Sequence, residues 1–558
     1  MKTFRFFTFC KIIFIFCVIS LTIGNNTAYS QTWQWAKCPT YCGVGVTYSI
    51  VDHENNILVY GGMGGDSVKF DTITLSNFGP FAQCFFIAKY DSNGNVIWAK
   101  NVTGNNTTGN DIYPVSIAVD IYNNIYAIGS FVDTFFVGGS KLFIPPLGID
   151  GDYIIKFNSE GDIIWAHAIS GYASFVISDN IGNIYITGLT NNYLFYDTIV
   201  LARPGYLNNM YIAKFDSGGH PLWARTAGDN TANVWGRELA VDKNNNIIVG
   251  GFYDGDFADF GATSISGGFM FLAKYNDIGN LQWVQSSGYY LHNYAEFINS
   301  IACDTMNNIN IIGTFSDSVR FGNELLIANN QANMFLTKYD SSGNVVWARA
   351  PIGNGSGSGI ATDPFNRIYA TCNYDSIINF GNGVTASGNF CVVKYDENGN
   401  ALWAKHAGNN SGNNHLGIGP ISIDQSGNIY VSGGFSDSLN IPSIPDLVDS
   451  FLPTCNDTDN MFLAKLSNPE NAPIINKAAN KIEVYPNPSS GAMQVAFMAN
   501  GYTGLRVYDA IGRQVYEQPL TGTERQVALQ LSNLPAGVYY LQATGKAGNA
   551  HVPFVIER

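Results

Sequence analysis

The side chains best suited to ligand chemistry are aromatic, basic and imidazole groups set among many asparagines and glycines. The candidates are Tyr113, Tyr172, Trp235, Arg237, Tyr290, His292 and His415. Aromatic rings beside amide groups can stack on sugar rings and hydrogen-bond their hydroxyls. These residues therefore predict a carbohydrate-binding site. The simpler alternative is that the tyrosines fill loops while the asparagines form turns.

Signals for catalysis are weak. The seven histidines are scattered, and neither H-E-x-x-H nor another close metal-ligand spacing occurs. Glu238 and Glu296 could act as paired carboxylates in glycoside cleavage, although each is more simply a solvated rim residue. We therefore expect a non-catalytic binding protein with no metal and no cofactor. A polysaccharide-acting enzyme and a structural surface-layer component are the alternatives.

Residues 1–30 have the features of a secretory signal peptide. Three basic residues flank the start of an apolar run from Ile12 to Ile23, and Ala28-Tyr29-Ser30 supplies small residues before a cut. This run is shorter than the roughly 20 residues of a spanning helix, and we expect no integral membrane segment after cleavage. Loss of the three basic residues changes the net charge from −14 to −17. Such a charge argues against nucleic acid as a partner.

A strand–turn–strand unit with tryptophan in its second strand recurs along the chain. Six copies run from FFIAKYDSNGNVIWAK at 85–100 to CVVKYDENGNALWAK at 391–405. Each has glycine at one place in the turn, where a hairpin needs φ > 0. These glycines are Gly94, Gly161, Gly219, Gly279, Gly343 and Gly399. We expect the tryptophans to pack between repeats rather than to bind ligand.

A second unit alternates with the first. Its seven turns run from VDHENNI at 51–57 to IDQSGNI at 423–429. Each begins with Asp and has Asn or Gly three residues later, where a left-handed conformation is tolerated. Each period therefore contains four strands, named a to d in chain order, as in a blade of a β-propeller. The turns lack the dense carboxylates of calcium loops.

The two ends of the repeat region complement each other. WQWAK at 33–37 is a strand d without its strand c, and MFLAKLS at 461–467 is a strand c without its strand d. Six intact hairpins and this split one predict seven four-stranded blades, with the N-terminal strand closing the ring. Residues 31–467 resemble the seven-bladed propeller-repeat family of secreted bacterial proteins. The variable b–c and d–a loops would share one face, and the d–a loops would carry the candidate ligand residues.

Seven cysteines follow the leader, and export would permit disulfides. The candidate pairs are Cys38 with Cys455, Cys42 with Cys84, and Cys372 with Cys391. The first pair flanks the closing blade on its loop-rich face and could lock the ring. Cys303 would remain a buried free thiol.

The pattern ends after Leu466, and a linker at 468–481 leads to a different domain at 482–558. Segments such as IEVYPNPSSG at 482–491 and LRVYDAIGRQVY at 505–516 alternate apolar strands with turns. They predict a small Ig-like β-sandwich. In their order at the C-terminus, these motifs resemble the type A sorting domain of the type IX secretion system. The motif positions are Tyr485, Pro486, Asn487, Pro488, Gly512 and Gly537.

This second resemblance implies an export route. The leader would deliver the chain to the periplasm, and the sorting domain would direct it across the outer membrane through the type IX secretion machinery. We therefore expect a secreted or outer-surface protein. Its variable loop face would bind a glycan or a surface protein.

Overall fold

The computed structural model describes most of the chain after residue 30. The described ranges are 31–40, 44–77, 84–102, 112–132, 134–137, 139–143, 151–190, 193–196, 199–202, 208–228, 232–261, 263–287, 297–328, 332–408, 417–436, 438–442, 444, 447–448, 459–467, 482–487, 489–497, 501–509, 513–545 and 548–557. The predicted leader and linker lie outside them. All regular structure in these ranges is β, which confirms an all-β protein. No helix within these ranges is long and apolar enough to cross a membrane.

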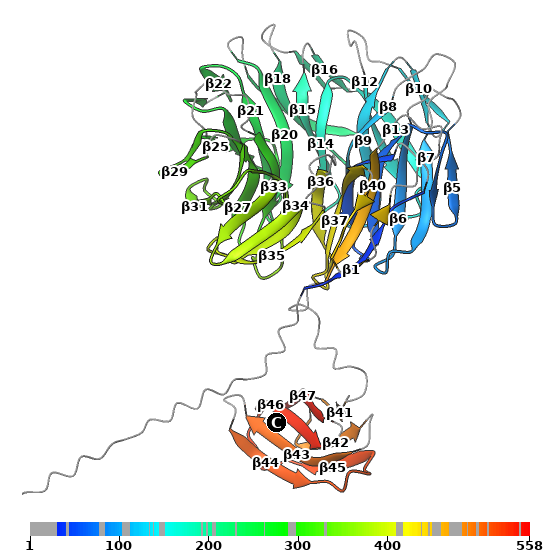
Figure 1. The fold of residues 1–558 in the computed structure, drawn as a ribbon, viewed down its shortest axis with the longest axis vertical. Coiled ribbons are helices and arrows are strands. Elements are labelled where there is room, and N and C mark those ends of the chain that lie inside the picture. Colours follow the sequence, from blue (N-terminus) through cyan, green and yellow to red (C-terminus); the bar gives the residue numbers. More distant parts are fainter. Residues whose placement is uncertain are drawn as a thin grey trace, which may run out of the picture. The chain divides into compact units, whose positions relative to one another are not determined.

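The chain forms two compact units, Met1–Asn471 and Ala472–Arg558. The first unit contains seven four-stranded antiparallel sheets in the described ranges (Figure 1). Sheet 1 has β2 (Val44–Val51), β3 (Ile57–Met63), β6 (Cys84–Tyr90) and β7 (Val96–Val102); sheet 2 has β8 (Ile112–Val119), β9 (Ile125–Phe131), β12 (Gly151–Phe157) and β13 (Ile163–Ile169). Sheet 3 has β14 (Tyr172–Ser178), β15 (Ile184–Thr190), β18 (Asn209–Phe215) and β19 (Pro221–Ala227); sheet 4 has β20 (Val234–Val241), β21 (Ile247–Tyr253), β24 (Met270–Tyr275) and β25 (Leu281–Ser287). Sheet 5 has β26 (Phe297–Cys303), β27 (Ile309–Phe315), β30 (Asn333–Tyr339) and β31 (Val345–Arg349); sheet 6 has β32 (Gly355–Thr362), β33 (Ile368–Gly381), β34 (Val384–Tyr395) and β35 (Ala401–Ala407). Sheet 7 has β36 (Gly417–Ile423), β37 (Ile429–Ser436), β40 (Asp459–Leu466) and β1 (Trp33–Lys37).

The sheets pack against one another in series. The first strands β2, β8, β14, β20, β26, β32 and β36 each contact the next, and β36 contacts β2. The second and third strands of a sheet are buried along almost their whole length, as in β6 and β27, because neighbouring sheets cover both faces. We call the end of a sheet where its first strand begins the loop end. The end where an Asp turn joins its first and second strands is the turn end.

The Asp of each turn between first and second strands is buried and fully bonded. In sheet 4, Asp242 accepts backbone N–H groups of Asn244 and Asn246 at 2.9 Å and pairs with Lys274 at 2.9 Å. Burial opposes ionisation, but the bonds from Lys274 and Asn246 hold the pKa of Asp242 below its usual value. Direct lysine pairs of this kind also occur in sheets 1 and 5. These carboxylates therefore stabilise turns and are not free for chemistry.

Sheets 2, 3, 6 and 7 satisfy the same carboxylate in another way. Six residues after Asp, a tyrosine hydroxyl donates to it, as from Tyr185 to Asp179 at 3.1 Å. The lysine of the third strand then lies over the tyrosine ring, with Lys214 Nζ 5.1 Å from the Tyr185 ring centroid. The equivalent hydroxyl bonds are made by Tyr126, Tyr369 and Tyr430.

Left-handed asparagines in these turns connect neighbouring sheets. Asn55, Asn123, Asn245, Asn307 and Asn366 all have φ near 60°, and Gly182 and Gly427 take this position in sheets 3 and 7. The prediction of a left-handed residue three positions after each Asp is therefore confirmed. The side chain then reaches the preceding sheet, as where Asn123 Oδ1 accepts the His53 N–H at 3.0 Å.

The repeated tryptophans pack on the repeated glycines of the following sheet. Trp283 of sheet 4 donates its indole N–H to the Ser341 carbonyl at 3.2 Å. Its ring lies 2.9–3.1 Å from where a Cβ of Gly343, with φ 86°, would stand. The same contact joins Trp35, Trp98, Trp165, Trp223 and Trp347 to Gly94, Gly161, Gly219, Gly279 and Gly399. Each glycine is thus required both for its positive φ and for the space that the indole occupies, and the predicted packing role of these tryptophans is confirmed.

Substituting Gly343 by alanine should destabilise the first unit by about 3 kcal/mol, because it adds a clash with Trp283 to the cost of a left-handed Cβ. Gly139 is the matched control, since its φ is 78° and nothing lies within 4 Å of its Cβ position. Gly139→Ala should cost only about 1 kcal/mol. Urea unfolding of both variants measures the difference, and equal costs would contradict packing of Trp283 on Gly343.

The N-terminal strand completes the last sheet. β1 pairs antiparallel with β40, and Ser467 N–H donates to the Thr32 carbonyl at 3.0 Å. On the other side, Gln425 N–H donates to Asn55 Oδ1 at 3.0 Å, which joins sheet 7 to sheet 1. The predicted pairing of the two complementary ends is therefore seen directly.

Short hairpins between second and third strands were not predicted. They are β4 (Ser67–Phe70) with β5 (Ile73–Ser76), β10 (Thr134–Val137) with β11 (Ser140–Phe143), β16 (Tyr193–Tyr196) with β17 (Ile199–Ala202), β22 (Phe257–Asp259) with β23 (Ser264–Ser266), β28 (Ser318–Phe321) with β29 (Glu324–Ile327), and β38 (Ser438–Leu439) with β39 (Leu447–Val448). In sheet 6 the long strands β33 and β34 extend instead. These connections therefore contain short paired strands rather than loops alone.

The second unit has two sheets around one core. One sheet contains β41 (Ile482–Tyr485), β42 (Ala492–Phe497) and β45 (Gln526–Gln530). The other contains β43 (Tyr502–Asp509), β44 (Gln514–Pro519), β46 (Gly537–Gly545) and β47 (Gly548–Ile556). Buried side chains such as Val495 and Leu541 belong to a shared apolar cluster.

Candidate functional site

A β-bulge interrupts the first strand of every sheet at an equivalent position. The extra residues are Thr47, Val115, Ser174, Arg237, Asn299, Ser358 and the Gly419-Pro420 pair. A bulge takes a residue out of the ladder and re-aims its side chain. Asn299 donates from Nδ2 to the Gly357 carbonyl of the next sheet at 2.7 Å. Arg237 is the one charged member of this set.

Four aromatic rings cluster beside Arg237 at the loop end of sheets 4 and 5. Trp235 and Phe252 face each other across β20 and β21, and their rings stack at 4.5 Å. Phe252 stacks in turn on Phe269 at 5.5 Å and a 7° interplanar angle. Phe297, the first residue of β26, meets Phe252 edge-on at 5.5 Å. All four rings are half-buried, so this aromatic cluster presents apolar surface to solvent.

The guanidinium of Arg237 completes the aromatic cluster. It lies 5.5 Å from the ring centroid of Phe297, and the Arg237 side chain is exposed. Within the described ranges, Arg237 forms no ion pair under 4.0 Å with a carboxylate. An accessible cation above an aromatic platform in an acidic chain is suited to an anionic ligand group.

Of the other predicted ligand residues, Tyr113 and Tyr172 lie in sheets 2 and 3, outside the two sheets that carry this cluster. Tyr113 and Tyr172 are 43% and 38% exposed at the loop ends of β8 and β14. They and Trp235 lie in strands, so their placement in loops was wrong; each strand begins earlier than the loop composition indicated. Tyr290, His292 and His415 lie outside the described residues. Phe252, Phe269 and Phe297 were missed, because Phe252 and Phe297 are apolar strand residues, Phe269 directly precedes β24, and their ring partners lie in other strands.

Glu238 follows Arg237 in β20 and lies near Tyr48 of β2. Burial raises the pKa of Glu238 well above its usual value, and the charge of Arg237 only partly opposes this. Burial and the charge of Glu238 in turn raise the pKa of Tyr48. The other predicted carboxylate, Glu296, lies outside the described residues, so the proposed acid pair has only one member here.

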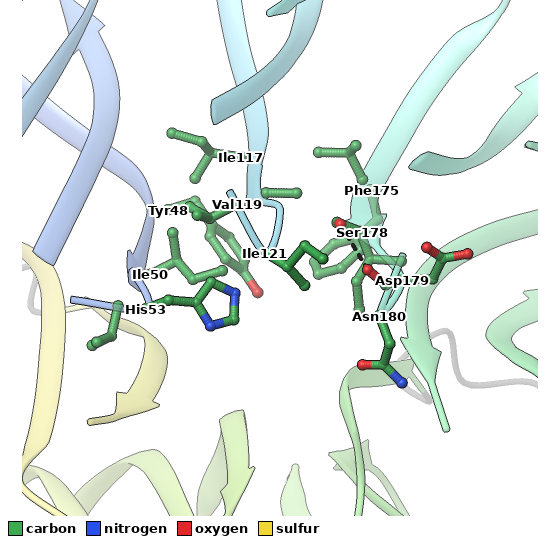
Figure 2. Close-up of a pocket in the computed structure, with 14 residues that line it drawn as sticks. Tyr48, Ile50, His53, Ile117, Val119, Ile121, Phe175, Ser178, Asp179 and Asn180 are labelled. Carbon is green, nitrogen blue, oxygen red and sulfur yellow. Dashed lines mark hydrogen bonds between the residues drawn. The ribbon is translucent and has the colours of Figure 1, made fainter. Parts of the chain in front are cut away.

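A pocket of about 270 Å³ opens at the turn end of sheets 1 to 3 (Figure 2). Tyr48, Ile117 and Phe175 belong to its lining, together with residues of the adjoining Asp turns. It lies at the opposite end of the first strands from Trp235. No sequence pattern predicted this pocket, because its lining combines ordinary strand and turn residues.

Cys84, Cys303, Cys372 and Cys391 are free thiols. Cys372 and Cys391 face each other across β33 and β34 with Sγ atoms 3.2 Å apart, longer than the roughly 2.05 Å of a disulfide. Burial raises the pKa of Cys84 to about 12. Cys42 and Cys455 lie outside the described residues, so the other two pairings stay predictions. Cys303 is a half-buried thiol.

The sorting-motif positions fall at the surface of the second unit where they are described. Tyr485, Pro486 and Asn487 are exposed, and Asn487 Oδ1 accepts the Val555 N–H at 2.8 Å. Gly537 begins β46. Pro488 and Gly512 lie outside the described residues. The motif therefore fastens the start of this unit to its last strand.

Residues 483–557 match the family of secretion-system C-terminal sorting domains. The second unit thus carries a sorting domain of the predicted kind, which indicates export to the cell surface or medium. The match covers this unit alone.

One curated relative matches the chain at low identity. Over 439 residues the chain is 25% identical to an uncharacterized WD repeat-containing protein of Acanthamoeba polyphaga mimivirus, covering 63% of this chain and 31% of that protein. The chain thus spans about a third of the length of this relative. The match supports a repeat architecture.

Solved structures resemble the chain only distantly. They include a polysaccharide lyase described as an ulvan lyase, at TM-score 0.37 and 11% identity over 72% of this chain and 93% of that one. An α-L-arabinofuranosidase from Fusarium graminearum matches at TM-score 0.34 and 11% identity over 78% and 99%. Likenesses at this level carry no conclusion about activity.

Proposed function

We propose that the seven sheets are the blades of a β-propeller and that the protein is a non-catalytic, extracellular glycan-binding protein. The observation that most supports glycan binding is the aromatic cluster of Trp235, Phe252, Phe269 and Phe297. Half-buried stacked rings provide a rigid, apolar surface that suits the faces of sugar rings. Rigid aromatic anchors also keep the entropic cost of binding low.

The ligand is an acidic glycan, carrying carboxylate or sulfate groups. Arg237 supports this choice, because a guanidinium forms strong bidentate hydrogen bonds with carboxylates and similar oxyanions. The chain is acidic overall, so an exposed arginine that forms no ion pair with any described carboxylate stands out as a specific contact. General electrostatic attraction would favour cationic ligands instead.

The test is an array of acidic and neutral oligosaccharides probed with the wild-type protein and Arg237→Gln. Arg237→Gln should weaken binding of the acidic ligand about tenfold to a hundredfold, corresponding to loss of a charge-assisted hydrogen bond. Weak binding of neutral sugars should not change. An equal loss of affinity for acidic and neutral sugars would show that Arg237 supports the fold rather than recognises the negative charge of the ligand.

Binding without cleavage is the favoured mode. Glycoside hydrolysis ordinarily needs two carboxyl groups roughly 5–10 Å apart, and Glu238 beside Tyr48 is the candidate acid that the described residues supply. Its raised pKa keeps a polysaccharide-acting enzyme as the second candidate function. Release of reducing ends by the wild type, lost in Glu238→Gln, would favour that alternative.

Export follows the type IX route. The leader delivers the chain to the periplasm, and the sorting domain at 483–557, an Ig-like sandwich, hands it to the secretion machinery at the outer membrane. The acidic-glycan site then faces the medium.

A further inference from the structure

The pocket at the turn end has three walls from three successive sheets. Ile50 of β2, Ile117 and Val119 of β8, and Ile177 of β14 give it an apolar lining. Figure 2 shows the side chains of Ile50, Ile117 and Val119 around the space between the strands. Neighbouring first strands bring these walls together, because β2 contacts β8 and β8 contacts β14.

Two aromatic rings meet in the interior of the pocket. Tyr48 of sheet 1 and Phe175 of sheet 3 pack edge to face, with ring centroids 5.5 Å apart and an interplanar angle of 77°. These rings come from sheets that are not neighbours in the series, so their contact crosses between the first strands.

The Tyr48 hydroxyl is a hydrogen-bond donor in the pocket, and His53, Ser178 and Asn180 add polar groups to its lining. Figure 2 shows the Tyr48 hydroxyl directed into the space beside His53 and Ile121. Burial raises the pKa of Tyr48, so the phenol keeps its proton and can donate. The lining carboxylate of Asp179 is already engaged, by Asn183 at 2.7 Å and Tyr185 at 3.1 Å.

The mouth of the pocket is held in place by bonds between turns. His53 N–H donates to Asn123 Oδ1 at 3.0 Å, and the His53 carbonyl accepts from Gln425 Nε2 at 3.1 Å. The turn that carries His53 is therefore fixed to both neighbouring sheets. A pocket with fixed walls and mouth is formed before any ligand arrives, which lowers the cost of binding.

We propose that this pocket binds a small, neutral, predominantly apolar molecule of about two rings that carries one hydrogen-bond acceptor. Its apolar body contacts the isoleucine and valine walls, and its acceptor bonds the Tyr48 hydroxyl. Size supports two rings, because an apolar cavity of about 150 Å³ holds benzene in another protein. This site is independent of the glycan site and lies at the other end of the first strands.

Two matched probes test this assignment on the purified protein. 2-Acetylnaphthalene carries a carbonyl acceptor, and 2-ethylnaphthalene has nearly the same shape without one. Ligand-observed NMR titrations of each probe give the affinities for wild type, Tyr48→Phe and Ile117→Phe. Tyr113→Phe is the control variant, since Tyr113 is an exposed tyrosine at the loop end.

The acetyl probe should bind wild type saturably, and Tyr48→Phe should weaken it about tenfold, the loss of one hydrogen bond. The same change should leave the ethyl probe unaffected. Ile117→Phe, which fills the pocket, should weaken both probes, and Tyr113→Phe should weaken neither. The assignment is overturned if neither probe binds saturably, if Tyr48→Phe affects both probes equally, or if Ile117→Phe affects neither. Unfolding midpoints of all variants show whether a loss reflects the pocket or the fold.

Discussion

Trp35→Ala should lower the free energy of unfolding of the first unit by about 3 kcal/mol, within the range for removing a large aromatic side chain from a packed site. Trp35 lies in β1, which completes sheet 7, yet its ring packs on Gly94 of sheet 1. Its indole N–H donates to the Ser92 carbonyl at 3.3 Å, and its ring lies 6.1 Å from that of Tyr430. One side chain therefore joins the last sheet to the first.

Urea unfolding, followed by fluorescence and circular dichroism, measures this cost. Gln34→Ala is the matched control, because Gln34 is exposed in the same strand and its side chain bonds only with Thr32 among the described residues. Gln34→Ala should change stability by less than about 0.5 kcal/mol. A change below about 1 kcal/mol for Trp35→Ala would mean that β1 does not close the series of sheets.

Trp235→Ala should weaken the acidic glycan at least thirtyfold, which corresponds to about 2 kcal/mol for a central aromatic anchor. Trp235 is half-buried and stacks on Phe252 at 4.5 Å, so its removal takes away an apolar face and frees its neighbour to move. Isothermal titration with the best acidic oligosaccharide from the array measures the loss.

Tyr113→Ala supplies the control for Trp235→Ala. Tyr113 is an exposed aromatic residue at the loop end of sheet 2 and lies apart from the aromatic cluster. Its removal should change the affinity by less than about twofold. Similar losses in the two variants would mean that the ligand spreads over the loop ends of several sheets. If both variants have the same unfolding midpoint as the wild type, a loss of affinity reflects a lost contact with the ligand rather than a loss of folded structure.

The repeat architecture could be predicted from the sequence, because the patterns that indicate it lie within short stretches of the chain. In a short turn motif, a glycine such as Gly343 or an asparagine such as Asn55 indicates a residue with positive φ. Both residues have positive φ, as predicted. The complementary ends were equally readable, because WQWAK and MFLAKLS each lack a partner strand nearby in the chain. Short-range patterns therefore predicted the strands, the turns and the pairing of β1 with β40.

Contacts between segments that are distant in the sequence could not be predicted in this way. Trp235 and Arg237 were selected for their chemistry, but Phe252, Phe269 and Phe297 look like ordinary core residues in a strand pattern. The bulge that re-aims Arg237 depends on hydrogen-bond register, which composition does not show. The contact of Tyr48 with Phe175 likewise depends on how separate sheets pack. Such sites emerge only when the sheets are placed together.

The most direct test of the glycan-binding claim is a crystal structure of the protein with the acidic oligosaccharide selected on the array. We expect a sugar ring packed against the aromatic cluster of Trp235, Phe252, Phe269 and Phe297. We also expect a carboxylate or sulfate oxygen of the ligand within hydrogen-bond distance of the Arg237 guanidinium. A sugar bound at Tyr113 or Tyr172, or at any place away from sheets 4 and 5, would contradict these expectations.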